Sequence, residues 1–155
     1  MRDDQGSGST NDADRKKKMY ADVMVEVERH FRPEFLNRVD ESIVFNPLTH
    51  EDLTKIVHLQ LNEVRERLTE HELTLNLTDN AIEFLITKGF HEDYGARPLR
   101  RAIERFIEDP MAEQLLRGNY ETGATIWLDR SEDAESLVFS DSNPELQPVE
   151  AGVGE

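Results

Sequence analysis

Cysteine is absent from the 155-residue chain, so neither a disulfide framework nor a thiolate metal site can form. Long apolar runs are also missing, because no stretch of about 18 apolar residues occurs, and we therefore expect no transmembrane helix. Residues 1–10 are polar and lack the apolar stretch of a signal peptide. Together these absences favour a protein of the reducing cytoplasm.

Basic residues are scarce. The chain has 18 Lys and Arg against 33 Asp and Glu, which gives a formal net charge of −15. A nucleic-acid backbone would be repelled by this charge, so we expect no nucleic-acid partner. The acidity is uneven: nine acidic residues follow from Glu121 onward, where Arg130 is the one basic residue. A basic patch can therefore exist upstream of that segment.

The motifs of common catalytic sites are missing as well. No H-E-x-x-H or other metal-ligand spacing joins the histidines, and no G-x-S-x-G elbow surrounds a serine. The glycine-rich residues 6–10 lack the lysine that a G-x-x-x-x-G-K-[ST] phosphate loop requires. We expect no metal site, and the chain alone shows no catalytic machinery. The five histidines are His30, His50, His58, His71 and His91.

The hydrophobic pattern predicts an α+β module with a small sheet. Apolar residues recur at helical spacing, or alternate as in strands, between turns that contain proline or glycine. We divide the chain into a disordered segment 1–15, a segment 16–47, a main module 48–140 and a disordered tail 141–155. The expected helices cover residues 20–31, 49–70, 78–89, 98–107 and 109–118, with a short turn at 33–38, and the expected strands cover 42–45, 73–77, 125–128 and 136–139.

Several helix ends carry capping residues. Thr49 is followed three residues later by Asp52, which predicts a capping box, and Thr78 is expected to cap the next helix. Gly89 is predicted to be the glycine that follows a helix C-terminus in the left-handed conformation. Asp109, with a proline after it, is predicted to cap a separate helix.

Arg97 lies at the start of the helix predicted at residue 98. A cation at a helix N-terminus is disfavoured by about 0.3–1 kcal/mol, so an arginine there is better explained if an anion binds beside it. Gly95 and Ala96 precede it and are small enough to allow close approach. Arg101 and Arg105 follow at intervals of four and extend the same helical face. The alternative is a solvated face on which these arginines pair with Glu104 and Glu108.

Arg38 is the second candidate. It follows Phe35 and Leu36, two apolar residues that could anchor a tight turn and direct the arginine outward. Asn37 and Asp40 could hold the backbone of this turn. The alternative, which these residues alone favour, is a structural pair between Arg38 and an aspartate.

Three segments resemble the Clp family of AAA+ unfoldases, and in particular ClpB and ClpC. Residues 31–41 resemble its F-R-P-E-F-[LI]-N-R-[IV]-D-E stretch, and residues 94–101 resemble its Y-G-A-R-P-L-[RK]-R box. Residues 107–112 resemble I-E-[DN]-P-[LM]-[AS]. The resemblance covers about residues 20–139.

The resemblance implies a fold and a role. Residues 16–47 would hold the last helix and strand of the large AAA+ subdomain, and residues 48–140 would form the small lid subdomain. Arg38 would be an arginine finger that reaches the ATP of a neighbouring subunit, and Arg97 would be the sensor 2 arginine, beside Gly95 and Ala96, that reads the nucleotide of its own subunit. The implied partners are the neighbouring subunits of a hexameric ring, unfolded protein substrates and a ClpP-type peptidase.

The departures from that family matter for activity. The chain has no Walker A, Walker B, sensor 1 or pore-loop motif, and nothing before Tyr20 resembles the loop that docks ClpP. We therefore expect no ATPase activity from the chain alone. Residues 108–110 lean towards ClpC rather than ClpB. The alternative function is a free-standing interaction protein that uses the lid fold to bind unfoldase subunits or a partner helix.

Overall fold

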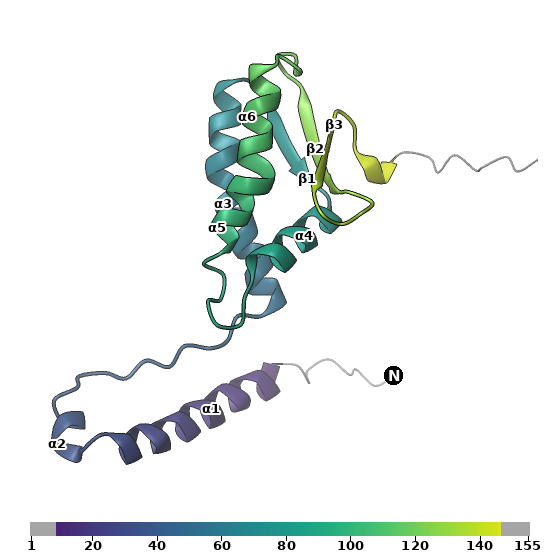
Figure 1. The fold of residues 1–155 in the computed structure, drawn as a ribbon. Helices are drawn as coiled ribbons and strands as arrows, with labels where there is room; N and C mark the ends of the chain where they lie inside the picture. Colours follow the sequence, from purple (N-terminus) through teal and green to yellow (C-terminus); the bar gives the residue numbers. More distant parts are fainter. Residues whose placement is uncertain (1–8, 147–155) are drawn as a thin grey trace, which may run out of the picture. The chain divides into compact units, whose positions relative to one another are not determined.

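A computed structural model describes residues 9–146, with side chains from residue 11 onward, and divides them into two units at residues 47 and 48. Each unit is described by itself. The first contains α1 (Ser9–His30) and α2 (Pro33–Leu36). The second, called the lid unit here, contains α3 (His50–Glu70), β1 (Thr74–Leu77), α4 (Asp79–Gly89), α5 (Leu99–Ile103), the π-helical turn η1 (Glu104–Glu108), α6 (Asp109–Leu116), β2 (Thr125–Arg130), β3 (Leu137–Ser140) and the 3₁₀ turn η2 (Pro144–Leu146) (Figure 1).

The first unit is helical further upstream than the sequence predicts. Helix α1 begins at Ser9, so residues 9–15 are helical rather than disordered, while residues 1–8 lie outside the described part. Lys16 and Asp12 form an i,i+4 ion pair at 3.0 Å, and Asp12 lies in the first turn, where a negative charge favours the helix. The helix ends before Pro33, as predicted, because Arg32 is extended with φ −68° and ψ 148°.

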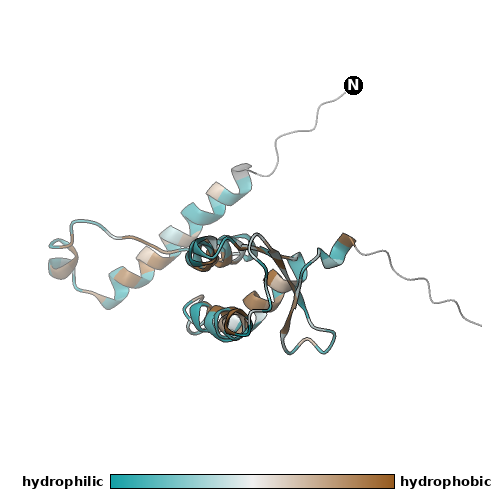
Figure 2. Cartoon of the chain, turned by 90° about the horizontal axis from the view of Figure 1, so that it is seen from above, coloured by the Kyte–Doolittle hydropathy of each residue, from teal (hydrophilic) through white to brown (hydrophobic). Residues whose placement is uncertain are grey.

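The strand expected at residues 42–45 does not form, and this prediction is wrong for the chain by itself. Residues 41–49 have no regular structure, and Ile43 and Phe45 are 69% and 89% exposed. A strand needs a neighbour to accept its hydrogen bonds, and none pairs with this segment among residues 9–146. The apolar colouring of α1 and α2 in Figure 2 likewise marks residues that have no core of their own to pack into.

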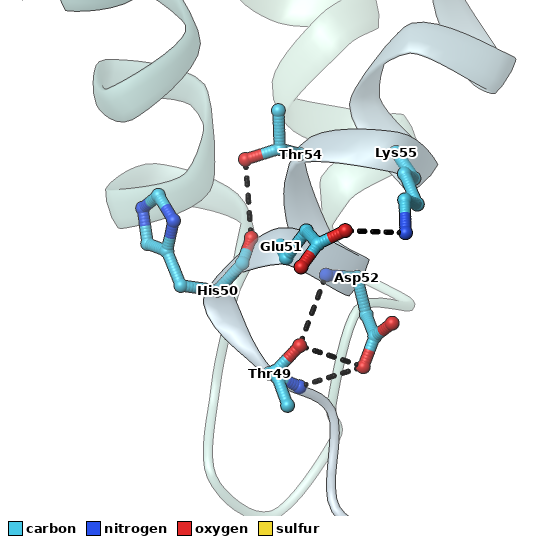
Figure 3. Close-up of polar contacts among 6 residues, drawn as sticks. All are labelled: Thr49, His50, Glu51, Asp52, Thr54 and Lys55. Atoms are coloured by element: carbon cyan, nitrogen blue, oxygen red, sulfur yellow. Dashed lines mark hydrogen bonds and ion pairs between the residues drawn. The ribbon is translucent and has the colours of Figure 1, made fainter. Parts of the chain in front are cut away.

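Helix α3 begins with the predicted capping box (Figure 3). The Asp52 amide donates to the Thr49 hydroxyl at 3.2 Å, and the Thr49 amide donates to the Asp52 carboxylate at 2.9 Å. The next turn adds an ion pair between Lys55 and Glu51 at 2.7 Å. Two free backbone donors are thus satisfied at the helix start, which sets the first residue of α3.

The three strands form one sheet in the order β1-β2-β3. β1 pairs in parallel with β2, with Leu75 opposite Ile126 and Leu77 opposite Leu128, and β2 continues into the predicted antiparallel hairpin with β3. The helices of the lid unit gather on one side of this sheet (Figures 1 and 2). The architecture is α+β, as predicted.

One hydrophobic core fills the lid unit. It joins the apolar face of α3 to α4, α5, η1 and the inward residues of β1 and β2. Phe84 and Phe106 meet edge to face with ring centroids 4.9 Å apart. The buried polar Thr78 ties helix to sheet, because its hydroxyl donates to Asp129 at 2.6 Å and accepts from the amide of Ala81 at 3.2 Å. Thr78 therefore caps α4, as predicted.

The two helices expected at 98–107 and 109–118 are one continuous helical run. Asp109 is not an N-cap: it lies within the run with φ −63° and ψ −50°, and its amide donates to the carbonyl of Glu104, five residues back. Pro110 lacks an N–H, and its ring disfavours a regular turn over the carbonyl four residues earlier. The π-helical turn η1 widens the helix at this point and keeps Pro110 inside it.

Gly89 has a different role from the predicted left-handed cap. It is the last residue of α4, and its φ is not positive. A Cβ built on Gly89 would lie 2.6 Å from both Cα and Cδ1 of Leu99, so the glycine allows α4 and α5 to touch. Gly118, by contrast, ends its helix with φ +68°, in the manner typical of such caps.

Within the described residues, no helix has the length and hydropathy needed to cross a membrane.

Candidate nucleotide-sensing site

The turn between α4 and α5 carries Gly95, Ala96 and Arg97. It closes on itself through two backbone hydrogen bonds, from the His91 amide to the Gly95 carbonyl at 3.1 Å and from the Gly95 amide to the His91 carbonyl at 2.6 Å. Gly95 has φ +61°, a conformation that residues with a Cβ adopt rarely. The glycine is therefore needed for the backbone path into Arg97.

Leu99 anchors this turn to the core. Its side chain is 1% exposed and packs directly against Gly89, as described above, while its amide donates to the Ala96 carbonyl at 3.1 Å. Because Leu99 is two residues after Arg97, the buried contact fixes the backbone of Arg97 while its side chain stays exposed. The turn therefore carries the exposed Arg97 side chain on a backbone that is anchored in the core by Leu99.

The Arg97 side chain has no hydrogen bond or ion pair within residues 9–146. It lines a surface pocket of about 310 Å³ together with Tyr94, Pro98 and Arg101. Among the described residues, no carboxylate lines this pocket. An arginine without a carboxylate, in a chain with nearly twice as many acids as bases, is available to bind an anion.

The alternative, in which this face pairs with Glu104 and Glu108, does not occur in the structure. Glu108 binds Arg67 of α3 instead, at 2.8 Å, and this hydrogen bond and the charge of Glu108 raise the pKa of Arg67 above its usual value. Glu104 forms no ion pair among the described residues. Arg105 lies over the ring of Phe106, with its guanidinium carbon 5.3 Å from the ring centroid.

Arg38 belongs to the other unit. Helix α2 and the turn after it are held by backbone bonds, from the Asn37 amide to Pro33 at 2.9 Å and from the Arg38 amide to Phe35 at 3.1 Å. The rings of Phe31 and Phe35 stack with centroids 5.3 Å apart, and Phe35 is 55% exposed, so the expected anchor of Phe35 and Leu36 is not buried. Arg38 is exposed, and its side chain makes no ion pair with Asp40 or any other described residue.

The arrangement therefore places two exposed guanidinium groups, those of Arg97 and Arg101, beside one pocket. Within the described residues, no set of three histidines, aspartates or glutamates is arranged to hold a metal ion. The pocket also includes Tyr94 and Arg101, of which Arg101 was expected on the same face as Arg97. The repeat of arginines at intervals of four was the signal for Arg101, whereas Tyr94 carried no signal beyond its place in the motif.

The α+β core and this turn, with the residues Y-G-A-R-P, define the chain as the small C-terminal domain of a Clp-type ATPase. The family described as the C-terminal, D2-small domain of ClpB protein matches residues 48–128, which is more than half of the chain, and the chain belongs to this family.

Relatives of both the ClpB and ClpC types are similar to the chain. Chaperone protein ClpB 1 of Thermosynechococcus vestitus is 48% identical over 128 residues, which is 83% of the chain and 15% of the relative. The negative regulator of genetic competence ClpC/MecB of Bacillus subtilis is 48% identical over 122 residues, or 79% of the chain and 15% of the relative. The chain therefore spans about one seventh of the length of these relatives.

Proposed function

We propose that the chain is the nucleotide-sensing and subunit-assembly C-terminal part of an ATP-dependent, Clp-type protein unfoldase, and that it does not hydrolyse ATP alone. The observation that carries the proposal is Arg97. Its guanidinium is unpaired within the described residues and lines a pocket in which none of these residues places a carboxylate. Such a group can report on the phosphates of a nucleotide bound elsewhere in the same subunit. Gly95 and Ala96 allow the phosphates to approach.

Arg38 would act in trans. In this proposal it reaches the ATP of the neighbouring subunit in a hexameric ring and stabilises the charge that develops on the transferred phosphoryl group. Its exposure and its lack of a described partner support this role over the structural pair with Asp40. The unfolded protein substrates, a ClpP-type peptidase and the cytoplasmic location belong to the same proposal.

The test grafts residues 20–139 onto a full-length ClpB relative, in place of the corresponding part of that protein. Arg97→Ala should weaken nucleotide binding, or its coupling to lid movement, in every subunit independently. Arg38→Ala should impair the adjacent site in mixed hexamers even when that site is intact, by roughly 10³–10⁵ in rate for a finger arginine. Arg38→Lys should not restore hydrolysis, because lysine lacks the planar fork that matches phosphate oxygens.

Arg29→Ala is the matched control, because Arg29 is an exposed arginine of the same unit that pairs with Glu26 at 3.0 Å. It should leave hydrolysis close to that of the unmodified graft. Near-normal hydrolysis with Arg38→Ala in the assembled ring would show that Arg38 is structural. Near-normal nucleotide binding and hydrolysis with Arg97→Ala would reject the sensor role.

A further inference from the structure

Most arginines of the lid unit have partners within the described residues. Arg67 binds Glu108, Arg100 binds Glu63 at 3.4 Å, and Arg117 binds Glu113 at 2.6 Å. Arg65 donates to the Leu75 carbonyl, and Arg105 lies over Phe106. Carboxylates thus pair with three arginines of this unit, and a carbonyl and an aromatic ring contact two more.

Three arginines of this unit differ, because their side chains make no hydrogen bond, ion pair or ring contact with the described part of the chain. One is Arg130, which lines a pocket together with Asp129 and Glu132, so carboxylates surround it. The other two are Arg97 and Arg101, and both line the pocket that contains no carboxylate. Two unneutralised positive charges therefore face the same space in a protein of net charge −15.

This pairing is unfavourable unless something else compensates it. Arg97 lies in the turn before α5 and Arg101 lies on α5, and two like charges beside one pocket repel one another. A bound anion attracts both guanidinium groups and offsets their repulsion, and each guanidinium can match phosphate oxygens with two parallel hydrogen bonds. Arg101 is held in place by its neighbours Ala102 and Ile103, which are 6% and 2% exposed, while its own side chain points to solvent.

We propose that Arg101 is a second phosphate-binding residue, which together with Arg97 holds the phosphate chain of a nucleoside triphosphate in this pocket. The inference rests on the proposed function, since it assigns a second ligand to the site of Arg97. One arginine leaves part of a polyphosphate charge exposed, whereas two can contact different phosphate groups. The residue acts by binding and takes no part in bond cleavage.

The experiment uses the full 155-residue chain and three probes: ATP, inorganic tripolyphosphate and adenosine. Binding is followed at about 20 mM salt, where the Debye length is long, by NMR shifts of the arginine side-chain N–H groups and of the amides of residues 94–101. The variants are Arg101→Gln, Arg101→Lys and Arg97→Gln. Arg130→Gln is the matched control, because Arg130 is also an arginine without a described side-chain partner but lies outside the pocket.

We expect ATP and tripolyphosphate to bind weakly and adenosine not to bind. Arg101→Gln should weaken both phosphate ligands by about 3- to 10-fold, as expected for one charge-assisted contact at an exposed site, and Arg97→Gln should do the same. Arg101→Lys should retain part of the affinity, because it keeps the charge. Arg130→Gln should change neither affinity. All variants should melt close to the unmodified chain, because these exposed side chains make no hydrogen bond or ion pair with the described residues.

If Arg101→Gln leaves both affinities unchanged while Arg97→Gln lowers them, Arg101 is a solvated arginine and the inference fails, but the sensor role of Arg97 stands. If Arg130→Gln lowers the affinities as much as Arg101→Gln, binding is diffuse and the inference is wrong. Absence of tripolyphosphate binding would overturn it as well. The proposed function is tested separately, by nucleotide binding and hydrolysis in the grafted ring that carries Arg97→Ala.

Discussion

Replacing Gly89 by alanine should destabilise the lid unit, although alanine is the better helix former. The new Cβ would lie 2.6 Å from Cα and Cδ1 of Leu99, well inside van der Waals contact. Cδ1 can rotate away, but Cα can move only if α5 moves. Overpacking of this kind costs about 1–3 kcal/mol, and the gain in helix propensity offsets at most about 1 kcal/mol. We expect a net loss of about 1–2 kcal/mol, or a melting temperature about 5–10 °C lower.

Comparing the stability of the alanine and asparagine variants at two glycines makes this test specific. At Gly118, which has φ +68° and open space around it, asparagine should be tolerated better than alanine, because asparagine adopts the left-handed conformation more readily. At Gly89 the order should reverse, since asparagine is larger and the obstacle is Leu99. Urea denaturation of the four variants measures both orders. A Gly89→Asn protein more stable than Gly89→Ala would show that Gly89 is a conformational cap and refute the contact argument.

Three further results are expected. The isolated chain should show no ATPase activity above buffer, because two arginines cannot replace a phosphate loop and Mg²⁺; activity that persists through further purification would contradict this. Thr78→Val should lower the free energy of unfolding by about 2–4 kcal/mol, through loss of the cap to Ala81 and the bond to Asp129, and Thr78→Ser should cost much less. Hydrogen bonds from the Ser131 hydroxyl and the Glu135 amide lower the pKa of Asp133 below its ordinary value of 3.8. The contribution of these bonds to the loop before β3 should therefore be present above pH 3.8 and be lost as the pH falls through the lowered pKa. Amide exchange of this loop measures the change.

Local chemistry made much of the lid unit predictable. A capping box depends on two residues three positions apart, so Thr49 and Asp52 identify the start of α3 without knowledge of any other element. Thr78 likewise caps α4, and Pro33 explains why α1 ends before it. In both caps the backbone amide that binds the threonine lies three residues away, within one helical turn. The α+β class followed from the same local signals and is confirmed.

Features that depend on distant contacts were predicted poorly. The role of Gly89 is set by Leu99, which is ten residues away and on another helix. The π-helical turn depends on how the helix accommodates Pro110 while Ile107 stays buried, and the sequence pattern suggested a break there instead. The parallel pairing of β1 with β2 crosses four helical segments. None of these contacts leaves a signal at short range in the sequence.

The candidate site also combines features that local sequence predicts with features that depend on distant contacts. The position of Arg97 follows from its local motif, and the structure adds that Glu108, a proposed partner of this face, binds Arg67 on a different helix. Whether an arginine is neutralised depends on every carboxylate that can reach it, so spacing along one helix could not settle the alternative. The shared pocket of Arg97 and Arg101 emerges only when the turn and helix are seen together.

Residues 16–47 show what an apolar pattern alone can establish. The same kinds of residues that form the core of the lid unit remain exposed here, with Phe35 at 55% and Phe45 at 89%, and none of the described side chains of residues 11–47 is buried. Helical spacing correctly predicted α1, because a helix satisfies its own hydrogen bonds. The strand at 42–45 needs a partner strand, which the described residues do not supply. In the proposed function the large ATPase subdomain provides that partner and the apolar surface, and the finger role of Arg38 depends on both.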